Sequence, residues 1–178
     1  MSRPELFAAI IPICGGGMYW NAGRLIHMGV WAFHGEEDIT VFPQESKKRT
    51  KEAFYNADVG LYSMTVGGDE YTVLGNALAI LAGLELDKEY VCEKIVNGEL
   101  SDCSLSMKIF KYDALLVTNK EKYQAWVLKE IRREYGKMIE QGDTVWETID
   151  GANAFDNAGS LCHGWSAIPI LYLDERKI

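Results

Sequence analysis

Two different hydrophobic patterns follow each other along the chain. Near the N-terminus, the apolar runs at residues 7–13 and 29–34 are short and end in glycine-rich turns, as buried strands of a parallel sheet do. Residues 19–28 between them have helical spacing. Residues 43–56 place Pro43 near a helix start and charges on an outer face. This part of the sequence predicts the order β-α-β-α.

From about residue 69 onward the apolar period is helical. Two apolar stripes recur at three- and four-residue steps, formed by Tyr71, Leu74, Leu78 and Leu81 and by Tyr123, Val127, Ile131, Tyr135 and Met138. The pattern therefore predicts two amphipathic helices, each with one apolar stripe.

Shorter helices fit the segments between and after these stripes. One is expected over 87–97, starting after Asp87 and stopping near Asn97 and Gly98. Another is expected over 104–117, with Ser104 as its cap.

Asn119 then opens the long helix that carries the second stripe. Residues 161–173 are apolar enough for a last buried helix, which Pro169 would kink. We therefore predict a mainly α-helical protein, built of helical hairpins, with a short N-terminal parallel β-α-β-α element. The expected division is into residues 1–55 and 56–178, and the second part shows no strand signal of comparable strength.

Composition and charge exclude several classes of partner. The chain has 178 residues, 48% of them hydrophobic, which is typical of a globular protein. Eighteen Lys and Arg residues against 26 Asp and Glu residues give a net charge of −8, so the sequence argues against nucleic acid as a partner. The N-terminal apolar run is too short for a signal sequence or a membrane span. We therefore expect a cytoplasmic protein that does not bind membranes.

The cysteines give no indication of a metal site. Cys14, Cys92, Cys103 and Cys162 are widely spaced, without a CxxC pair or a histidine at zinc-ligand spacing. Reduced, mostly buried thiols are expected instead. No metal and no cofactor is predicted.

The N-terminal stretch resembles a known family. FAAIIPICGGG, followed by VWAFHGEEDITVFPQES, is similar to the later strands of α/β-hydrolase esterases of the phospholipase/carboxylesterase and dienelactone-hydrolase kind, over about residues 4–53. The resemblance implies that Asp38 stands at the acid position of a Ser-His-Asp triad. The GxSxG nucleophile elbow is missing from the chain, however, and no histidine follows Asp38 at the expected short distance. The alternative is that His34 and Asp38 only close a turn.

The C-terminal stretch resembles another family over about residues 54–173. YGKMIEQGDTVWETIDG, followed by SLCHGWSAIPILYL, is similar to the last hairpins of the six-hairpin α/α-toroid domain of α-L-rhamnosidases, which are inverting glycoside hydrolases. The resemblance implies that Glu147 is the general base and His163 a substrate-contacting histidine. It places the general acid in an earlier part of the toroid, which this sequence does not contain.

The residue types near Glu147 also suit a sugar. Pyranose rings present apolar C–H faces flanked by hydroxyls, so a carbohydrate site combines aromatic planes with short polar groups. The candidate substrate-binding residues of these two types are Trp146, His163, Trp165, Asp156 and Asn157. A structural alternative remains for each kind of group: Glu147 could bind backbone donors, His163 could be a hydrogen-bonded structural histidine, and the tryptophans could be core residues.

Three functions follow from these observations. The first is a glycoside hydrolase-like protein with a carbohydrate substrate and incomplete catalytic machinery. The second is an esterase remnant that uses Asp38. The third is a non-catalytic carbohydrate-binding or interaction module, in which exposed apolar helix faces drive self-association into a homo-oligomer.

Overall fold

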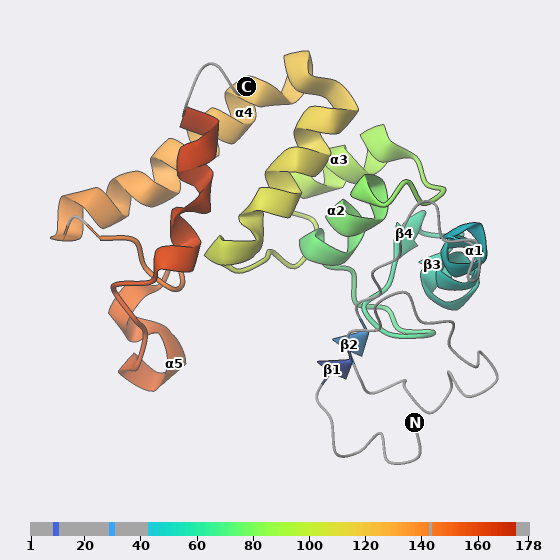
Figure 1. The fold of residues 1–178 in the computed structure, drawn as a ribbon, viewed down its shortest axis with the longest axis horizontal. Helices are drawn as coiled ribbons and strands as arrows, with labels where there is room; N and C mark the ends of the chain where they lie inside the picture. The colour runs from blue at the N-terminus through green and yellow to red at the C-terminus, as the bar shows by residue number, and fades with distance from the viewer. Residues whose placement is uncertain (1–8, 11–28, 31–42, 143, 174–178) are drawn as a thin grey trace. The chain divides into compact units, whose positions relative to one another are not determined.

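The structure, a computed structural model, describes residues 9–10, 29–30, 43–142 and 144–173. These residues belong to two compact units, Met1–Tyr71 and Thr72–Ile178, here called the N-terminal and C-terminal units. The described part of the chain is mainly helical with small sheets, which confirms the predicted fold class (Figure 1). The division after Tyr71 lies later in the chain than the boundary expected near residue 55.

The N-terminal unit contains the predicted parallel pair and the helix after it. Strands β1 (Ala9–Ile10) and β2 (Gly29–Val30) pair in parallel, with Ala9 opposite Gly29. Helix α1 (Pro43–Phe54) starts at the predicted proline, whose fixed φ suits a first helical turn. The helix expected over 19–28 lies outside the described residues.

A small hairpin follows α1. Strands β3 (Tyr55–Asn56) and β4 (Leu61–Tyr62) are antiparallel, and the rings of Tyr55 and Tyr62 lie 5.1 Å apart. The Asn56 side-chain oxygen accepts hydrogen bonds from the backbone N–H groups of Asp58 and Val59, which closes the turn. The pattern did not predict this hairpin.

In the C-terminal unit, two short helices have local caps. The Thr72 hydroxyl accepts a hydrogen bond from the Gly75 N–H at the start of α2 (Val73–Leu81). Asp87 caps α3 (Lys88–Val96) in the same way through the Tyr90 N–H, as predicted. Helix α3 ends at Val96 with Asn97 as its C-cap, and Gly98 adopts the positive φ of 71° that glycine readily takes after a helix.

The buried face of α2 differs from the predicted stripe. Val73, Ala77 and Ile80 are buried, whereas Leu81 is exposed. Almost every residue of this helix is apolar, so more than one stripe can be drawn along it. The tertiary contacts select the face, because the Val73 N–H bonds to the Ser101 carbonyl and the helix packs against α4.

Helix α4 (Lys108–Gly142) is the longest element and bends at Asn119, where φ is −157° and ψ is 91° (Figure 1). The Asn119 side chain accepts a hydrogen bond from the Lys122 N–H, so it caps the second part of α4, as predicted. All five residues of the predicted second stripe are buried: Tyr123, Val127, Ile131, Tyr135 and Met138. Ser104 stands at the predicted N-cap position, where it precedes the 3₁₀ turn η3 (Leu105–Met107), but its side chain makes no capping bond.

Three short segments follow α4 in the described part of the chain, and η5 packs on α4. They comprise η4 (Gly151–Asn153), α5 (Ala154–Asn157) and η5 (Gly164–Leu173), a 3₁₀ helix in the segment where the sequence predicts the last helix. The Tyr135 hydroxyl donates to the Ser166 carbonyl at 2.8 Å, and the Tyr172 hydroxyl donates to the Ile109 carbonyl at 3.1 Å. These bonds hold η5 against both parts of α4. Among the described residues, no helix combines the length and hydropathy that crossing a membrane requires.

Candidate functional site

The segment after α4 folds back on itself and brings the predicted sugar-site residues into one loop. The Glu147 N–H donates to the Ser160 carbonyl at 2.9 Å, and the His163 N–H donates to the Val145 carbonyl at 2.8 Å. This pairing makes residues 144–147 and 160–163 antiparallel neighbours. The loop therefore places the backbones of Glu147 and His163 on adjacent segments.

Both candidate side chains in this loop are partly accessible. Glu147 is half-buried, and its Oε2 accepts a long hydrogen bond of 3.4 Å from the Ser160 N–H. That contact supports part of the structural alternative, in which the carboxylate binds a backbone donor. His163 is also half-buried, and in the part of the chain that the structure describes no hydrogen bond joins the two side chains. The roles that the resemblance implies for the two side chains stay predictions.

The two tryptophans differ in their surroundings. Trp146 is only 7% exposed, and its ring lies against Gly151, where an added Cβ would come within 2.8 Å of it. Its environment is that of a core residue, which was the structural alternative for the tryptophans. Trp165 is 74% exposed at the start of η5, so its face is available to a ligand.

The two polar candidates lie on a turn with unusual backbone geometry. Phe155, Asp156 and Asn157 have φ angles of 50°, 57° and 69°, a left-handed conformation that costs non-glycine residues roughly 1–2 kcal/mol each. All three side chains are exposed. Asp156 and Asn157 are thus presented to solvent on a tight turn. Asp38, the predicted esterase acid, lies outside the described residues.

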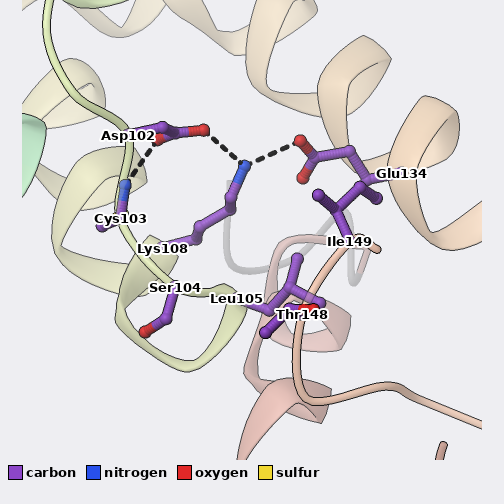
Figure 2. Close-up of a pocket in the computed structure, with 8 residues that line it drawn as sticks. All are labelled: Asp102, Cys103, Ser104, Leu105, Lys108, Glu134, Thr148 and Ile149. Atoms are coloured by element: carbon purple, nitrogen blue, oxygen red, sulfur yellow. Dashed lines mark hydrogen bonds and ion pairs between the residues drawn. The ribbon is translucent and has the colours of Figure 1, made fainter. Parts of the chain in front are cut away.

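A buried ionic cluster that the sequence reasoning missed lies close to this loop. We call it the lysine–carboxylate cluster; its members are Asp102, Lys108, Lys111, Glu130 and Glu134. The Lys108 ammonium donates to Glu134 at 2.7 Å and to Asp102 at 3.0 Å (Figure 2). It also donates to Glu130 at 3.2 Å. Lys111 bonds Glu130 at 2.9 Å and Asp102 at 3.2 Å, and its ammonium lies 5.3 Å from the Trp126 ring centroid.

The charges of the cluster decide its protonation. Burial alone would lower the pKa of Lys108, but the charge of Glu130 and the hydrogen bond to Glu134 raise that pKa well above its usual value. Burial would likewise raise the pKa of Asp102, yet the charges of Lys108 and Lys111 hold it below its usual value. Both groups are therefore ionised at neutral pH.

Three carboxylates of the cluster could in principle ligate a cation. Oxygen atoms of Asp102, Glu130 and Glu134 lie within 4.8 Å of one another. The Lys108 ammonium, however, already bonds all three of these side chains. A metal dication at the same place would meet this buried positive charge, so the arrangement favours the ion pairs over a metal.

A pocket of about 140 Å³ opens beside the cluster. Its lining residues come from the segment before α4, from α4 itself and from the loop just after Glu147, and they are Asp102, Cys103, Ser104, Leu105, Lys108, Glu134, Thr148 and Ile149 (Figure 2). The residues that follow the candidate base in sequence thus form one wall of this pocket.

Comparison of the sequence with models of protein families and with curated proteins finds no match.

Proposed function

We propose that the chain is a glycoside hydrolase-like protein of the inverting α-L-rhamnosidase type, with Glu147 as its general base. The observation that carries the proposal is the antiparallel pairing of residues 144–147 with 160–163, which sets Glu147 beside the segment of His163. Their accessibility further supports it, since both side chains are partly open to solvent.

The chemistry of the base fits its surroundings. A general base in an inverting enzyme activates a water that attacks the anomeric carbon, opposite the second carboxyl group. Among the described residues, only Oε2 of Glu147 contacts a backbone donor, and the bond is long. The other oxygen can therefore accept the proton of a water molecule. The general acid is not assigned to a residue.

The binding of the sugar is assigned to the exposed groups of the same loop. The open face of Trp165 suits stacking against the apolar C–H face of a pyranose, and Asp156 and Asn157 offer acceptors and donors for its hydroxyls. Trp146 supports the loop from inside. We place this activity in the cytoplasm on the sequence argument given above.

The decisive experiment measures release of nitrophenol from p-nitrophenyl α-L-rhamnoside. We expect slow hydrolysis that Glu147→Gln abolishes, whereas Glu140→Gln, an exposed glutamate on α4, leaves the rate unchanged. Binding of L-rhamnose is measured separately by tryptophan fluorescence, and Trp165→Ala should weaken it.

The hydrolysis and binding measurements distinguish the glycoside hydrolase from the non-catalytic binding module. Saturable L-rhamnose binding without hydrolysis would replace the proposal by the non-catalytic carbohydrate-binding module. The absence of both binding and hydrolysis would overturn the proposal altogether. Hydrolysis that survives Glu147→Gln would also overturn it.

A further inference from the structure

The pocket beside the lysine–carboxylate cluster contains an unpaired carboxylate oxygen. Glu134 is only 5% exposed, and its Oε1 accepts hydrogen bonds from Lys108 at 2.7 Å and from Arg133 at 3.4 Å. Its Oε2 is buried and accepts no hydrogen bond from the part of the protein that the structure describes. Figure 2 shows this second oxygen on the side of Thr148 and Ile149. Because buried carboxylate oxygens are normally hydrogen-bonded, this atom indicates a donor other than the described residues.

A second unpaired polar atom lines the same pocket. The Thr148 hydroxyl oxygen is buried and has no hydrogen-bond partner among the described residues. Thr148 comes from the loop and Glu134 from α4, so two different elements each contribute one unsatisfied group. One molecule that donates hydrogen bonds would satisfy both.

The cluster offers an unpaired carboxylate oxygen, which favours a cationic donor. Its members carry three negative charges and two positive ones. Arg133 reaches Glu134, but its side chain is 67% exposed and its charge is screened by water. Asp102 is likewise 49% exposed, so the buried charges are two negative ones, on Glu130 and Glu134, and two positive ones, on Lys108 and Lys111. The buried part of the cluster is therefore balanced, and a cation is favoured by the strength of a charge-assisted hydrogen bond to the unpaired Glu134 oxygen.

The size and walls of the pocket restrict the cation. A cavity of about 150 Å³ holds a molecule the size of benzene, and this pocket measures about 140 Å³. Leu105 and Ile149 provide apolar walls beside the polar atoms (Figure 2). A bare metal ion would leave these walls without a contact. A short alkyl chain would cover them.

We propose that this pocket is a binding site for a small organic ammonium compound, whose N–H groups bond Glu134 Oε2 and Thr148 Oγ1 and whose alkyl part contacts Leu105 and Ile149. The site is independent of the proposed glycosidase activity, because it uses none of the residues assigned to that activity. A primary ammonium group has three N–H donors. Two of them can bond the two unpaired acceptors, and the third can bond solvent.

The test is titration of the full chain with n-propylammonium chloride. Binding is monitored through the NMR signals of the Thr148 and Ile149 methyl groups. We expect a saturable shift of both signals. Tetramethylammonium has the charge without N–H donors, and 1-propanol has the same chain without the charge. At equal concentration and ionic strength, neither should produce the shift.

Variants locate the binding site. Glu134→Gln should weaken n-propylammonium binding by at least about tenfold, because the charge-assisted hydrogen bond is lost. Thr148→Val, which keeps the shape of the side chain, should weaken it several-fold and covers the case in which Glu134→Gln does not fold. Glu140→Gln, on the exposed face of the same helix, is the matched control and should leave the affinity unchanged.

Three outcomes would overturn the proposal. The first is the lack of a saturable shift, and the second is an equal response to 1-propanol or tetramethylammonium. The third is n-propylammonium binding that is unchanged in both single variants, Thr148→Val and Glu134→Gln. An equal response to 1-propanol would mean that the pocket takes neutral hydroxyl groups.

Discussion

Lys108 and Glu134 lie 26 positions apart in the sequence and meet at 2.7 Å inside the C-terminal unit, where each side chain is less than one-tenth exposed. The contact joins the start of α4 to its second part across the bend at Asn119. A buried ion pair of this kind fixes the angle between the two parts, because a different angle would separate two charges that water cannot reach.

Removal of one partner should therefore destabilise the protein strongly. Lys108→Met leaves Glu134 buried with only the exposed Arg133 as a counter-charge, and we expect a loss of about 3–5 kcal/mol in the free energy of unfolding, measured with urea. Lys137→Met, an exposed lysine on the same helix, should change it little.

A double replacement provides the complementary test. Lys108→Met combined with Glu134→Leu removes both charges, and it should recover a large part of the lost stability, because hydrophobic residues can replace a buried ion pair. Equal stability of Lys108→Met and the wild type would contradict the importance of this contact.

The cluster also predicts that the stability of the protein falls at acidic pH. The folded-state pKa of Asp102 lies below its ordinary value of 3.8, so the unfolded chain binds more protons in that range. The stability that Asp102 contributes is fully present above about pH 4 to 5 and is lost as the pH falls through the folded-state pKa. Urea unfolding between pH 3 and pH 6 should show this decline.

Asp102→Asn should flatten the decline, while Glu140→Gln should leave its slope unchanged. A slope that is the same in Asp102→Asn as in the wild type would show that other carboxylates account for the acid sensitivity. Because Asp102 is 49% exposed, the effect should shrink as salt is added.

Two glycines decide the shape of the loop that carries Glu147. Gly151 has a φ of 56°, and a Cβ there would lie 2.8 Å from the Trp146 ring. At Gly159 a Cβ would lie 2.0 Å from the Gly151 carbonyl oxygen, which is backbone and cannot move aside alone. We expect Gly151→Ala to cost at least about 1–2 kcal/mol of stability and Gly159→Ala to cost more.

Near-ultraviolet circular dichroism reports the packing of Trp146 and should change in both variants. Gly164→Ala is the matched control, since no atom lies within 4 Å of its added Cβ. An unchanged spectrum and unchanged stability in Gly159→Ala would show that the loop does not pack as described.

Local signals made parts of the fold predictable from the sequence. The start and end of α3 follow from Asp87, Asn97 and Gly98, because caps act on backbone groups within a few residues. The buried face of α2 could not be predicted in this way. Its sequence, VLGNALAIL, is apolar nearly all round, and contacts with distant segments select the face.

The lysine–carboxylate cluster did leave a signal in the sequence. Lys108 and Lys111 are three residues apart, and Glu130 and Glu134 are four residues apart, each pair beside apolar stripe positions of α4. Charges of opposite sign at helical spacing on two parts of one long helix can indicate a buried pair. Their meeting depends on the bend at Asn119, whose angle the sequence does not specify.

The cysteines provide a last prediction, which concerns chemical accessibility. Burial, followed by the nearby charge of Asp102, raises the pKa of Cys103 to about 12, so roughly one thiol in ten thousand is ionised there at pH 8. Cys92 is buried, and burial raises its pKa too, whereas Cys162 is exposed. Because the thiolate is the reactive form, iodoacetamide at pH 8 should modify Cys162 first among these three described cysteines and Cys103 and Cys92 much later, as followed by peptide mass spectrometry. In urea the three rates should converge; Cys103 reacting as fast as Cys162 in the native protein would contradict its position beside the cluster.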